Sequence, residues 1–341
     1  MTFGKTGEAE MSVRLRPLLK DEKIAVAIPT KNRHGYLTAL LTSLANQTYK
    51  NWMLVVNDSS DSPVEEDNVI KDLLTLIRMQ GHEVNIIRTN TGWNRHQRAM
   101  EAIPETIELI VRVDDDVMFP PDFLRQIIKP FYFFPDKPVA AVGGCAPEPN
   151  RQPLNLDFVL TNDHWTPTID EPTWRLQGNH YHQQYVIEVE SLLGHVICYR
   201  RSAVEAVGGW AVKGYSNQAH REETDLCMRL RAAHSTLLVT TEALAWHLYS
   251  PGGGSRTISK DATGVHLAKA DIEKISFDEL LFRKRLQELK EQGLTEQVLF
   301  KYRLQDLESS CVRPLPIVTW TDLIKRRVNQ ASRLIKRIAI R

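Results

Sequence analysis

The stretch LIVRVDDD, residues 109–116, decides the fold of this chain. Its first five residues are mostly apolar and β-branched, which predicts a short buried strand, and three aspartates follow directly. Pro120 and Pro121 then stop regular structure and allow a helix to begin. Like charges at the end of a buried strand repel one another unless water solvates them or a cation lies among them. The stretch therefore predicts either a solvated, helix-capping loop or a cation site.

The chain around this stretch alternates between two patterns. Further apolar runs predict buried strands, at residues 23–29, 53–56, 84–87 and 139–143. Apolar residues at helical spacing lie between them, at 36–44 and 64–79, and residues 90–102 are expected to hold a loop and a helix. Such alternation predicts an α/β fold with a parallel sheet covered on both faces. Each strand ends in polar residues, so we expect Thr30, Asp58 and Asp116 along one sheet edge, where open α/β sheets bind ligands.

The second half of the chain has a different pattern. Residues 146–184 are rich in Pro, Asn, Asp, His and Trp, which predicts a long irregular insertion of a kind that is usually functional or disordered. Later runs predict strands at 186–190, 195–199 and 237–241 and helices at 222–233, 268–292 and 295–307. We expect a loose arm (1–21), an α/β domain (22–262) and a helical C-terminal region (263–341) that ends in a basic amphipathic helix.

Composition excludes several classes of protein. The 341 residues suffice for one large domain with an appendage, and a net charge of +1 gives no overall attraction to nucleic acid or membrane. The four cysteines are widely spaced, which argues against a disulfide framework or zinc knuckle and suits a reducing compartment. No stretch approaches the ~18 apolar residues of a spanning helix. We expect a cytoplasmic protein, with the inner face of a membrane as an alternative location.

Five motifs, in this order, resemble the GT-A glycosyltransferases and family 2 in particular. They are the strand and turn at 24–33, SLANQTY at 43–49 with the strand into NDSSD at 57–61, the aspartates at 114–116 in place of a DxD motif, YRR to GGW at 199–210, and REETDLCMRL at 221–230. The resemblance covers about residues 22–250. It implies a GT-A fold, an α/β architecture with a Rossmann-like mixed sheet flanked by helices, here with a helical C-terminal extension. No QxxRW-like motif appears, which argues against a processive polysaccharide synthase.

The resemblance implies transfer of a sugar from a nucleotide sugar, expected to be UDP-linked, to an acceptor hydroxyl with inversion. The leaving diphosphate gains negative charge, and a bound Mn²⁺ or Mg²⁺ would stabilise it. Asp116 is the first expected metal ligand, and Asp114 is expected at the ribose or, through water, at the metal. Asp115 is assigned only to the nucleotide side. His247 follows a strand and is either a third metal ligand or a structural histidine.

The resemblance also implies a nucleotide pocket, lined by Pro29, Thr30, Asn32, Arg33, Asp58, Asp114 and Asp115. Asp58 is expected to accept a hydrogen bond from the base, and the backbone of 29–30 to contact the nucleoside. Its loop reads NDSS where the family usually has Asp-Asp-Gly-Ser. Arg95 and Arg98 either bind the diphosphate or lie on a solvated helix face.

The acceptor side needs a base beside the attacking hydroxyl. Adjacent acids on a helix point about 100° apart, so only one of Glu222 and Glu223 can face the site well. The register of the motif favours Glu223, with Asp225 as the second candidate base. Glu222 is either an acceptor-side residue or an acidic cap for the helix dipole. The acceptor-side candidates include Trp165 and Trp174 of the insertion, whose aromatic rings stack on sugars or pack on the core. The resemblance also implies Trp210 on the acceptor side.

The partners beyond the donor are less defined. The acceptor is a glycan, a lipid-linked compound or another hydroxyl compound. Residues 312–341 hold eight basic residues and one acid, a net charge of +7. A helix over 318–341 can lie on an anionic membrane surface or pack on its own domain, and contact with a nucleic-acid acceptor is a less favoured third interpretation.

Two other functions compete with glycosyl transfer. A nucleotidyltransferase would need a Gly-rich, basic loop after the first strand, and residues 30–35 (TKNRHG) are a poor version of one. An inactive nucleotide-sugar-binding or membrane-binding module should have lost its reactive acids, yet both acidic clusters are intact.

Overall fold

The computed structural model describes residues 18, 21–89, 94–134, 136–146, 185–192, 194–210, 213–248, 254, 258–261, 264–295, 299–309 and 315–316. The predictions for the N-terminal arm, for the insertion with Trp165 and Trp174, and for the basic segment 318–341 concern residues outside these ranges. Within the described ranges, no helix is long and apolar enough to cross a membrane.

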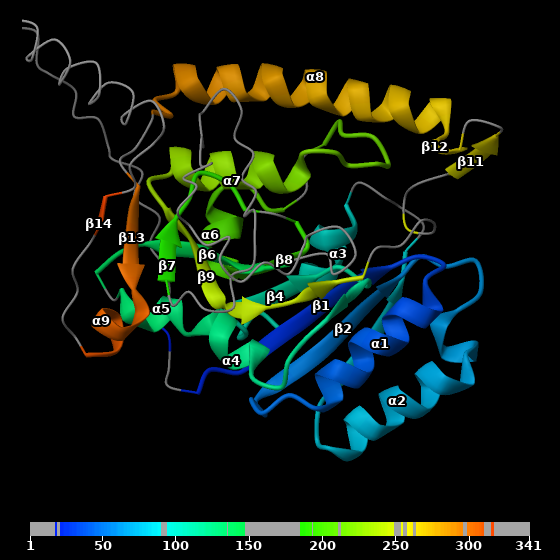
Figure 1. Cartoon of the computed structure of the whole chain (residues 1–341). Helices are drawn as coiled ribbons and strands as arrows, with labels where there is room; N and C mark the ends of the chain where they lie inside the picture. The colour runs from blue at the N-terminus through cyan, green and yellow to red at the C-terminus, as the bar shows by residue number, and fades with distance from the viewer. Residues whose placement is uncertain are drawn as a thin grey trace, which may run out of the picture.

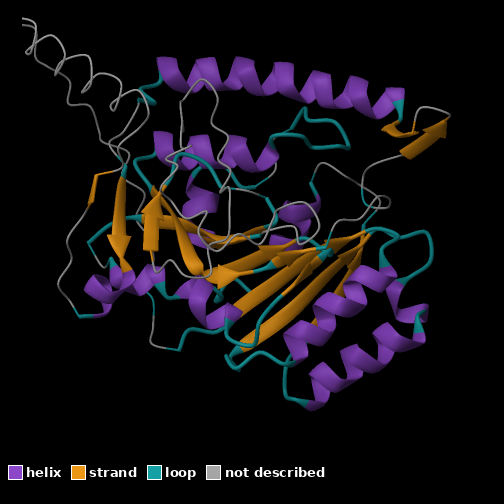
Figure 2. Cartoon of the chain, viewed as in Figure 1, coloured by secondary structure: helices purple, strands orange, loops and turns teal. Residues whose placement is uncertain are grey.

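A ten-stranded mixed sheet forms the centre of the molecule (Figures 1 and 2). Its strands are β1 Ile24–Thr30, β2 Trp52–Asp58, β3 Val84–Arg88, β4 Leu109–Val113, β6 Val139–Cys145, β7 Tyr185–Glu188, β8 Val196–Arg200, β9 Thr236–Leu244, β13 Phe300–Arg303 and β14 Leu315–Pro316. They lie in the order β14-β13-β7-β9-β6-β8-β4-β1-β2-β3. Strands β1 to β4 pair in parallel, which confirms the pattern predicted for the first half. β8 runs antiparallel between β4 and β6 and makes the sheet mixed.

Helices cover both faces of the sheet. One core joins it to α1 His34–Ala45, α2 Asn68–Met79, α4 Phe123–Ile128, α5 Pro130–Phe133 and α9 Leu304–Glu308, and includes the short 3-10 helix η1 Val64–Glu66. The other core contains α3 Arg95–Glu101, α6 Arg201–Ala206, α7 Glu222–Ala232 and α8 Lys269–Glu291. Two short antiparallel pairs complete the fold, β5 Val117–Met118 with β10 Trp246–His247 and β11 Ile258–Asp261 with β12 Gly264–Leu267.

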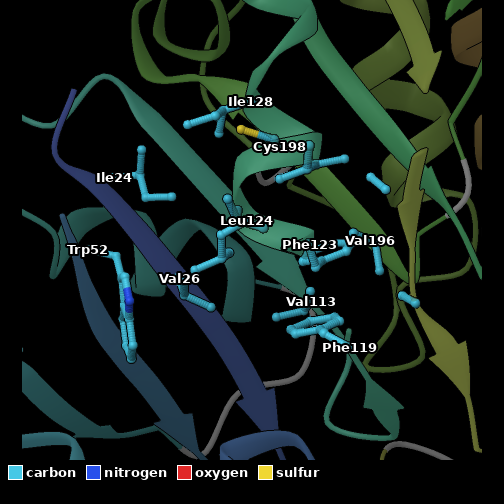
Figure 3. Packing of buried hydrophobic residues seen from close by; sticks show 14 of the residues in the cluster. Ile24, Val26, Trp52, Val113, Phe119, Phe123, Leu124, Ile128, Val196 and Cys198 are labelled. Atoms are coloured by element: carbon cyan, nitrogen blue, oxygen red, sulfur yellow. The ribbon is translucent and has the colours of Figure 1, made fainter. Parts of the chain in front are cut away.

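The sequence of β1 explains why both faces are covered. Ile24, Val26 and Ile28 belong to the core under α1, whereas Ala25 and Ala27 belong to the core under α3 and α7. Alternate side chains of a strand point to opposite faces, so a strand that is apolar at every position must be buried on both. Figure 3 shows the first of these cores, where large side chains from β1 and α4 meet.

The C-terminal region, predicted to be helical, also contains the strands β12, β13 and β14. α8 confirms the helix expected at 268–292, but 300–303, expected to be helical, form strand β13. β13 pairs with β7, and Tyr302 is buried against the core with its hydroxyl donating to Glu188 Oε1 at 2.8 Å. The unpaired edge of β7 therefore recruits a segment whose own pattern did not decide between helix and strand.

Strand register brings the predicted polar residues together. Thr30 lies opposite Asp58 at the carboxyl ends of β1 and β2, and β4, which leads into residues 114–116, pairs with the other side of β1. His247 on β10 lies opposite Val117 on β5, and the Leu248 backbone N–H donates to the Asp116 carbonyl at 2.7 Å. The chain therefore returns to the aspartates from 130 positions away.

Candidate active site

Asp114 is held by two basic side chains. Arg112 Nη2 lies 2.8 Å from its Oδ1, and His195 Nδ1 lies 3.0 Å from its Oδ2. Its backbone N–H also donates to the His195 carbonyl at 3.0 Å. Burial opposes ionisation of this carboxyl, but Arg112 and His195 outweigh it and hold the pKa of Asp114 well below its ordinary value. Asp114 is therefore an anion.

Arg33 joins the other two aspartates. Its Nη1 donates to Asp115 Oδ1 at 2.9 Å and to Asp116 Oδ2 at 2.8 Å, and both carboxyls are buried. The Thr30 hydroxyl donates to Asp115 Oδ2 at 2.7 Å. Burial, together with the charge of Asp116, raises the pKa of Asp115 to about 6, and Arg33 and Thr30 offset this only in part. Asp115 is thus tied to the protein through both of its oxygens.

Asp116 retains one oxygen that is suited to a cation. Its Oδ1 is buried and takes no hydrogen bond from any described residue, while His247 Nε2 lies 3.5 Å away. Unsatisfied buried carboxylate oxygens are costly, and an ion such as Mn²⁺ accepts both carboxylate oxygen and imidazole nitrogen. Asp116 and His247 therefore fit a divalent cation, and the β5–β10 pair holds them at this separation.

The two acids that begin α7 lie in different surroundings. Glu222 has a side chain that is 3% exposed, with Oε1 2.9 Å from Arg95 Nη2 and 3.0 Å from His96 Nε2. Burial raises the pKa of Glu222 to about 7, although Arg95 and Arg112 oppose the rise. Glu223 is 20% exposed, and its Oε1 lies 3.3 Å from Arg112 Nη2. Only Glu223 therefore has a carboxylate that is partly open to solvent.

Glycine at position 194 is what allows Glu223 to lie where it does. A Cβ at this position would collide with Glu223 Oε1, so the carboxylate rests directly against the backbone. Gly194 immediately precedes His195, the partner of Asp114. Residues 194 and 195 therefore contact an acid of α7 and an acid of the stretch 114–116, respectively.

Arg112 connects the two acidic clusters. The same nitrogen, Nη2, lies 2.8 Å from Asp114 Oδ1 and 3.3 Å from Glu223 Oε1, and it is 3.1 Å from His96 Nε2. The sequence interpretation assigned no role to Arg112, His96 or His195. The available signal was an arginine inside an apolar strand, because a buried guanidinium must have anionic partners nearby.

Asp225, the second candidate base, forms hydrogen bonds to other side chains of the protein through both of its oxygens. Its Oδ1 accepts from Arg229 Nε at 2.7 Å and from Arg285 Nη2 at 3.3 Å, and its Oδ2 accepts from Arg285 Nε and from the Tyr215 hydroxyl. The carboxyl is fully buried and ties α7 to α8. Both oxygens of this buried carboxylate are occupied by hydrogen bonds from other side chains, so this geometry does not favour Asp225 as the base.

Trp210 and Arg98 also have partners of their own. Trp210 is buried, with its ring 5.0 Å from that of His96 and 4.8 Å from that of Tyr199, and so belongs to the core behind the site. Arg98 is 56% exposed and pairs with Glu101 on its own helix at 3.2 Å. Arg98 therefore lies on a solvated helix face, which was the alternative to binding the diphosphate. Trp210 packs in the core, and its place on the acceptor side stays a prediction.

Asp58 shapes the loop after β2. Its Oδ1 accepts from the Ser60 N–H at 2.8 Å, and its Oδ2 accepts from the Val64 N–H at 3.0 Å and from Arg88. Burial opposes ionisation, but these hydrogen bonds lower the pKa of Asp58. The structure thus uses both oxygens locally, and the expected hydrogen bond to a base stays a prediction.

Asn32 joins the turn after β1 to the same loop. Its amide donates to Asp61 Oδ2 at 3.0 Å, its side-chain oxygen accepts from the Asp61 N–H at 2.9 Å, and its own N–H donates to Ser60 Oγ at 2.9 Å. Asn32 has a φ of 54°, a left-handed conformation that asparagine tolerates better than most residues. Together with half-buried Pro29, these bonds fix the walls of the expected nucleoside pocket.

The comparisons with known proteins agree with the motifs. The sequence profile described as "Glycosyl transferase family 2" matches residues 25–208, more than half of the chain. No curated protein matches the chain. Among solved structures, the mannosyltransferase PcManGT from Pyrobaculum calidifontis, in complex with GDP-Man and Mn²⁺, is 14% identical with a TM-score of 0.46, covering 69% of this chain and 59% of that one.

Two structures of TarS from S. aureus are also similar. TarS itself is 16% identical with a TM-score of 0.44, covering 67% of this chain and 37% of that one. TarS 1–349 in complex with UDP-GlcNAc is 16% identical with a TM-score of 0.45, covering 79% and 72%. The chain thus spans about three fifths of PcManGT and less than two fifths of full TarS. On the extent of the profile match, the chain belongs to glycosyl transferase family 2.

Proposed function

We propose that the protein is a metal-dependent glycosyltransferase that moves a sugar from a nucleotide sugar, UDP-linked, to an acceptor hydroxyl with inversion. One observation carries the proposal beyond the family: Arg112 Nη2 lies 2.8 Å from Asp114 on the donor side and 3.3 Å from Glu223 on the acceptor side. A single displacement needs a base and a leaving-group site on opposite sides of one carbon. Arg112 lies between Asp114 and Glu223, and this supports a site with the leaving group on one side and the base on the other.

Glu223 is the proposed base. As the acceptor oxygen attacks the anomeric carbon, Glu223 takes the hydroxyl proton, and the bond between that carbon and the diphosphate oxygen breaks with its electrons leaving on the diphosphate. Glu222 is unsuited to this role because it is buried against Arg95 and His96. The Glu223 side chain is 20% exposed and that of Glu222 only 3%, so an acceptor hydroxyl can reach Glu223 more easily.

Asp116 and His247 are the proposed holders of a divalent cation, Mn²⁺ or Mg²⁺, with Asp114 nearby at the nucleotide. When bound, such a cation offsets the negative charge that develops on the leaving diphosphate. Asp116 Oδ1 takes no hydrogen bond from any described residue and lies 3.5 Å from His247 Nε2, which supports this assignment. Arg33, which already bridges Asp115 and Asp116, is the proposed second positive group facing the diphosphate.

Donor binding provides the first test. Thermal shifts of the full chain are measured with UDP-glucose, UDP-N-acetylglucosamine and GDP-mannose, each with and without Mn²⁺. Because a ligand that binds the native state raises its stability, we expect at least one UDP-sugar to raise the Tm, and only in the presence of Mn²⁺. A protein that none of these donors stabilises would contradict the proposal.

Turnover provides the second test, and Glu223→Gln is the variant. The assay follows slow hydrolysis of the stabilising donor by NMR, which also shows whether the released sugar has the inverted anomeric configuration. We expect Glu223→Gln to retain donor binding and to slow hydrolysis by roughly 100-fold, the usual contribution of a general base. Glu273→Gln on the exposed face of α8 is the matched control and should react like the wild type. Equal rates in the two variants would remove Glu223 from the mechanism.

A further inference from the structure

The imidazole of His195 lies between the two halves of the proposed site. On one side, the preceding residue, Gly194, supports the carboxylate of Glu223. On the other side, the His195 ring is 4.0 Å from the His247 ring, with an interplanar angle of 30°. If Glu223 is the base and His247 binds the metal, as in the proposed function on which this inference rests, the transferred sugar has to lie between them. His195 is therefore next to that sugar.

One nitrogen of this imidazole is already committed. Its Nδ1 lies 3.0 Å from Asp114 Oδ2, and the other oxygen of Asp114 is 2.8 Å from Arg112 Nη2. An ionised carboxylate can only accept, so Nδ1 carries the hydrogen of this bond. The tilted contact with the His247 ring restricts the plane of the His195 ring as well. The orientation of His195 is thus set by the protein before any ligand arrives.

The other nitrogen is available. Among the described residues, Nε2 of His195 has no hydrogen-bond partner, and the side chain is 31% exposed. A sugar hydroxyl both donates and accepts, so it can pair with Nε2 in either role that this nitrogen takes. The position of Nε2 between Glu223 and His247 therefore matches a hydroxyl of the transferred sugar.

We propose that His195 is a specificity-determining residue whose Nε2 forms a hydrogen bond with a hydroxyl of the transferred sugar. Asp114 acts in this contact as a positioning residue, because it holds the histidine by Nδ1. A site with a fixed partner for one hydroxyl discriminates against a sugar that lacks this hydroxyl, since that hydrogen bond is then lost.

Two substitutions distinguish the role of Nδ1 of His195 from that of Nε2. In His195→Asn the carboxamide can replace Nδ1 and keep the contact with Asp114, but it cannot reach the position of Nε2. In His195→Gln the longer carboxamide can present its oxygen near that position. Affinities are measured by calorimetry with Mn²⁺ present, for UDP and for the nucleotide sugar that stabilises the wild type. His234→Asn, an exposed histidine elsewhere, is the control.

We expect UDP affinity to change less than about twofold in every variant. The ratio of nucleotide-sugar affinity to UDP affinity should fall roughly threefold to tenfold in His195→Asn, the size of one lost neutral hydrogen bond, and recover in part in His195→Gln. A donor that lacks the bound hydroxyl should lose the same factor with the wild type and nothing further with His195→Asn, because the two changes remove one interaction.

Each contrary result has a distinct meaning. A parallel loss of UDP affinity in His195→Asn overturns the inference, since the histidine would then serve the diphosphate or the metal. Unchanged affinities for both ligands overturn it in favour of a purely structural histidine. A wild-type protein that binds UDP and no nucleotide sugar overturns the proposed function, and this inference with it.

Discussion

The proposed donor half and the proposed acceptor half of the site are built in different ways. Thr30, Asp58 and the aspartates at 114–116 follow neighbouring parallel strands, so the sheet itself brings them to one edge. Glu222 and Glu223 instead begin a helix that the chain enters through two left-handed residues, Ala219 (φ 50°) and Arg221 (φ 71°). Such conformations persist only where surrounding contacts hold them. The donor half thus depends on strand register, and the acceptor half on packing from outside the sheet.

That packing comes from α8. The buried carboxylate of Asp278 accepts from the Ser216 N–H at 2.6 Å, the Ser216 hydroxyl at 2.7 Å and the His220 N–H at 2.9 Å. Arg285 of the same helix binds Asp225 on α7. Figure 1 shows α8 lying along α7, on the face away from α1 and α2. The helical C-terminal region is therefore part of the site's support, although it lies beyond the profile match at 25–208.

Asp116→Asn should break the donor half with the largest effect. The amide removes the charge that the proposed cation needs, so Mn²⁺-dependent donor binding should disappear and turnover should fall by roughly a thousandfold. Calorimetry with UDP, with and without Mn²⁺, measures the binding part. Asp122→Asn, an exposed acid a few positions on, is the control. Metal-dependent UDP affinity that survives in Asp116→Asn would remove this residue from the cation site.

Asp278→Ala should break the acceptor half and leave the donor half intact. Three donors on the loop before α7 lose their acceptor, and we expect the free energy of unfolding to fall by about 3 kcal/mol. In the folded population, turnover should fall while UDP affinity remains within about twofold of the wild type. Chemical denaturation and UDP calorimetry measure the two effects. An equal loss of UDP affinity would show that the two halves are not separable.

Glu222→Gln tests the raised pKa of Glu222 through the pH dependence of stability. The unfolded chain ionises Glu222 near its ordinary pKa of 4.5, but the folded protein does so at about 7. Between these values the folded state keeps a proton that the unfolded state has released, so stability falls as pH rises through this window. We expect the wild type to lose on the order of 2 kcal/mol more than Glu222→Gln between pH 5 and pH 7. Denaturation curves with parallel pH dependence would contradict the raised pKa.

Gly194→Ala should have the smallest effect and the most local one. The new Cβ collides with Glu223 Oε1, which is the end of a flexible side chain and can move aside. We therefore expect the Tm to change little and turnover to fall roughly tenfold, because the base is displaced from the acceptor. Gly293→Ala, at a glycine of positive φ with open space around it, tests strain without a collision. Normal turnover in Gly194→Ala would argue against Glu223 as the base.

Sequence patterns predicted the donor half better than the acceptor half for a physical reason. Apolar strands and their polar ends are local features, and parallel pairing places those ends together whatever the loops do. The partners of Asp225 and Glu223 are different, because Arg285 and Arg112 lie 60 and 111 positions away in the chain. Helical spacing alone cannot distinguish an acid that faces solvent from one that a distant arginine neutralises.

The same reason accounts for the remaining differences. Trp210 looked available to an acceptor because a tryptophan after two glycines carries no sign of what covers it, and the cover is His96 and Tyr199. The strand at 300–303 exists because β7 offers a free edge, which nothing within that segment reveals. His195 was missed because its importance comes from Asp114 and His247, which lie far from it in sequence.

The guanidinium between Asp115 and Asp116 has a consequence for the order of assembly. Two carboxylates and one arginine already form a site of small net charge, so a lone divalent cation would leave it with an excess of positive charge. A diphosphate alone would bring an excess of negative charge. The two together are nearly neutral, so the protein should take them up as a pair, each raising the affinity for the other by the same factor. If the proposed cation site is correct, Arg33 thereby makes the pair of metal ion and donor, rather than either one alone, the species that the site recognises.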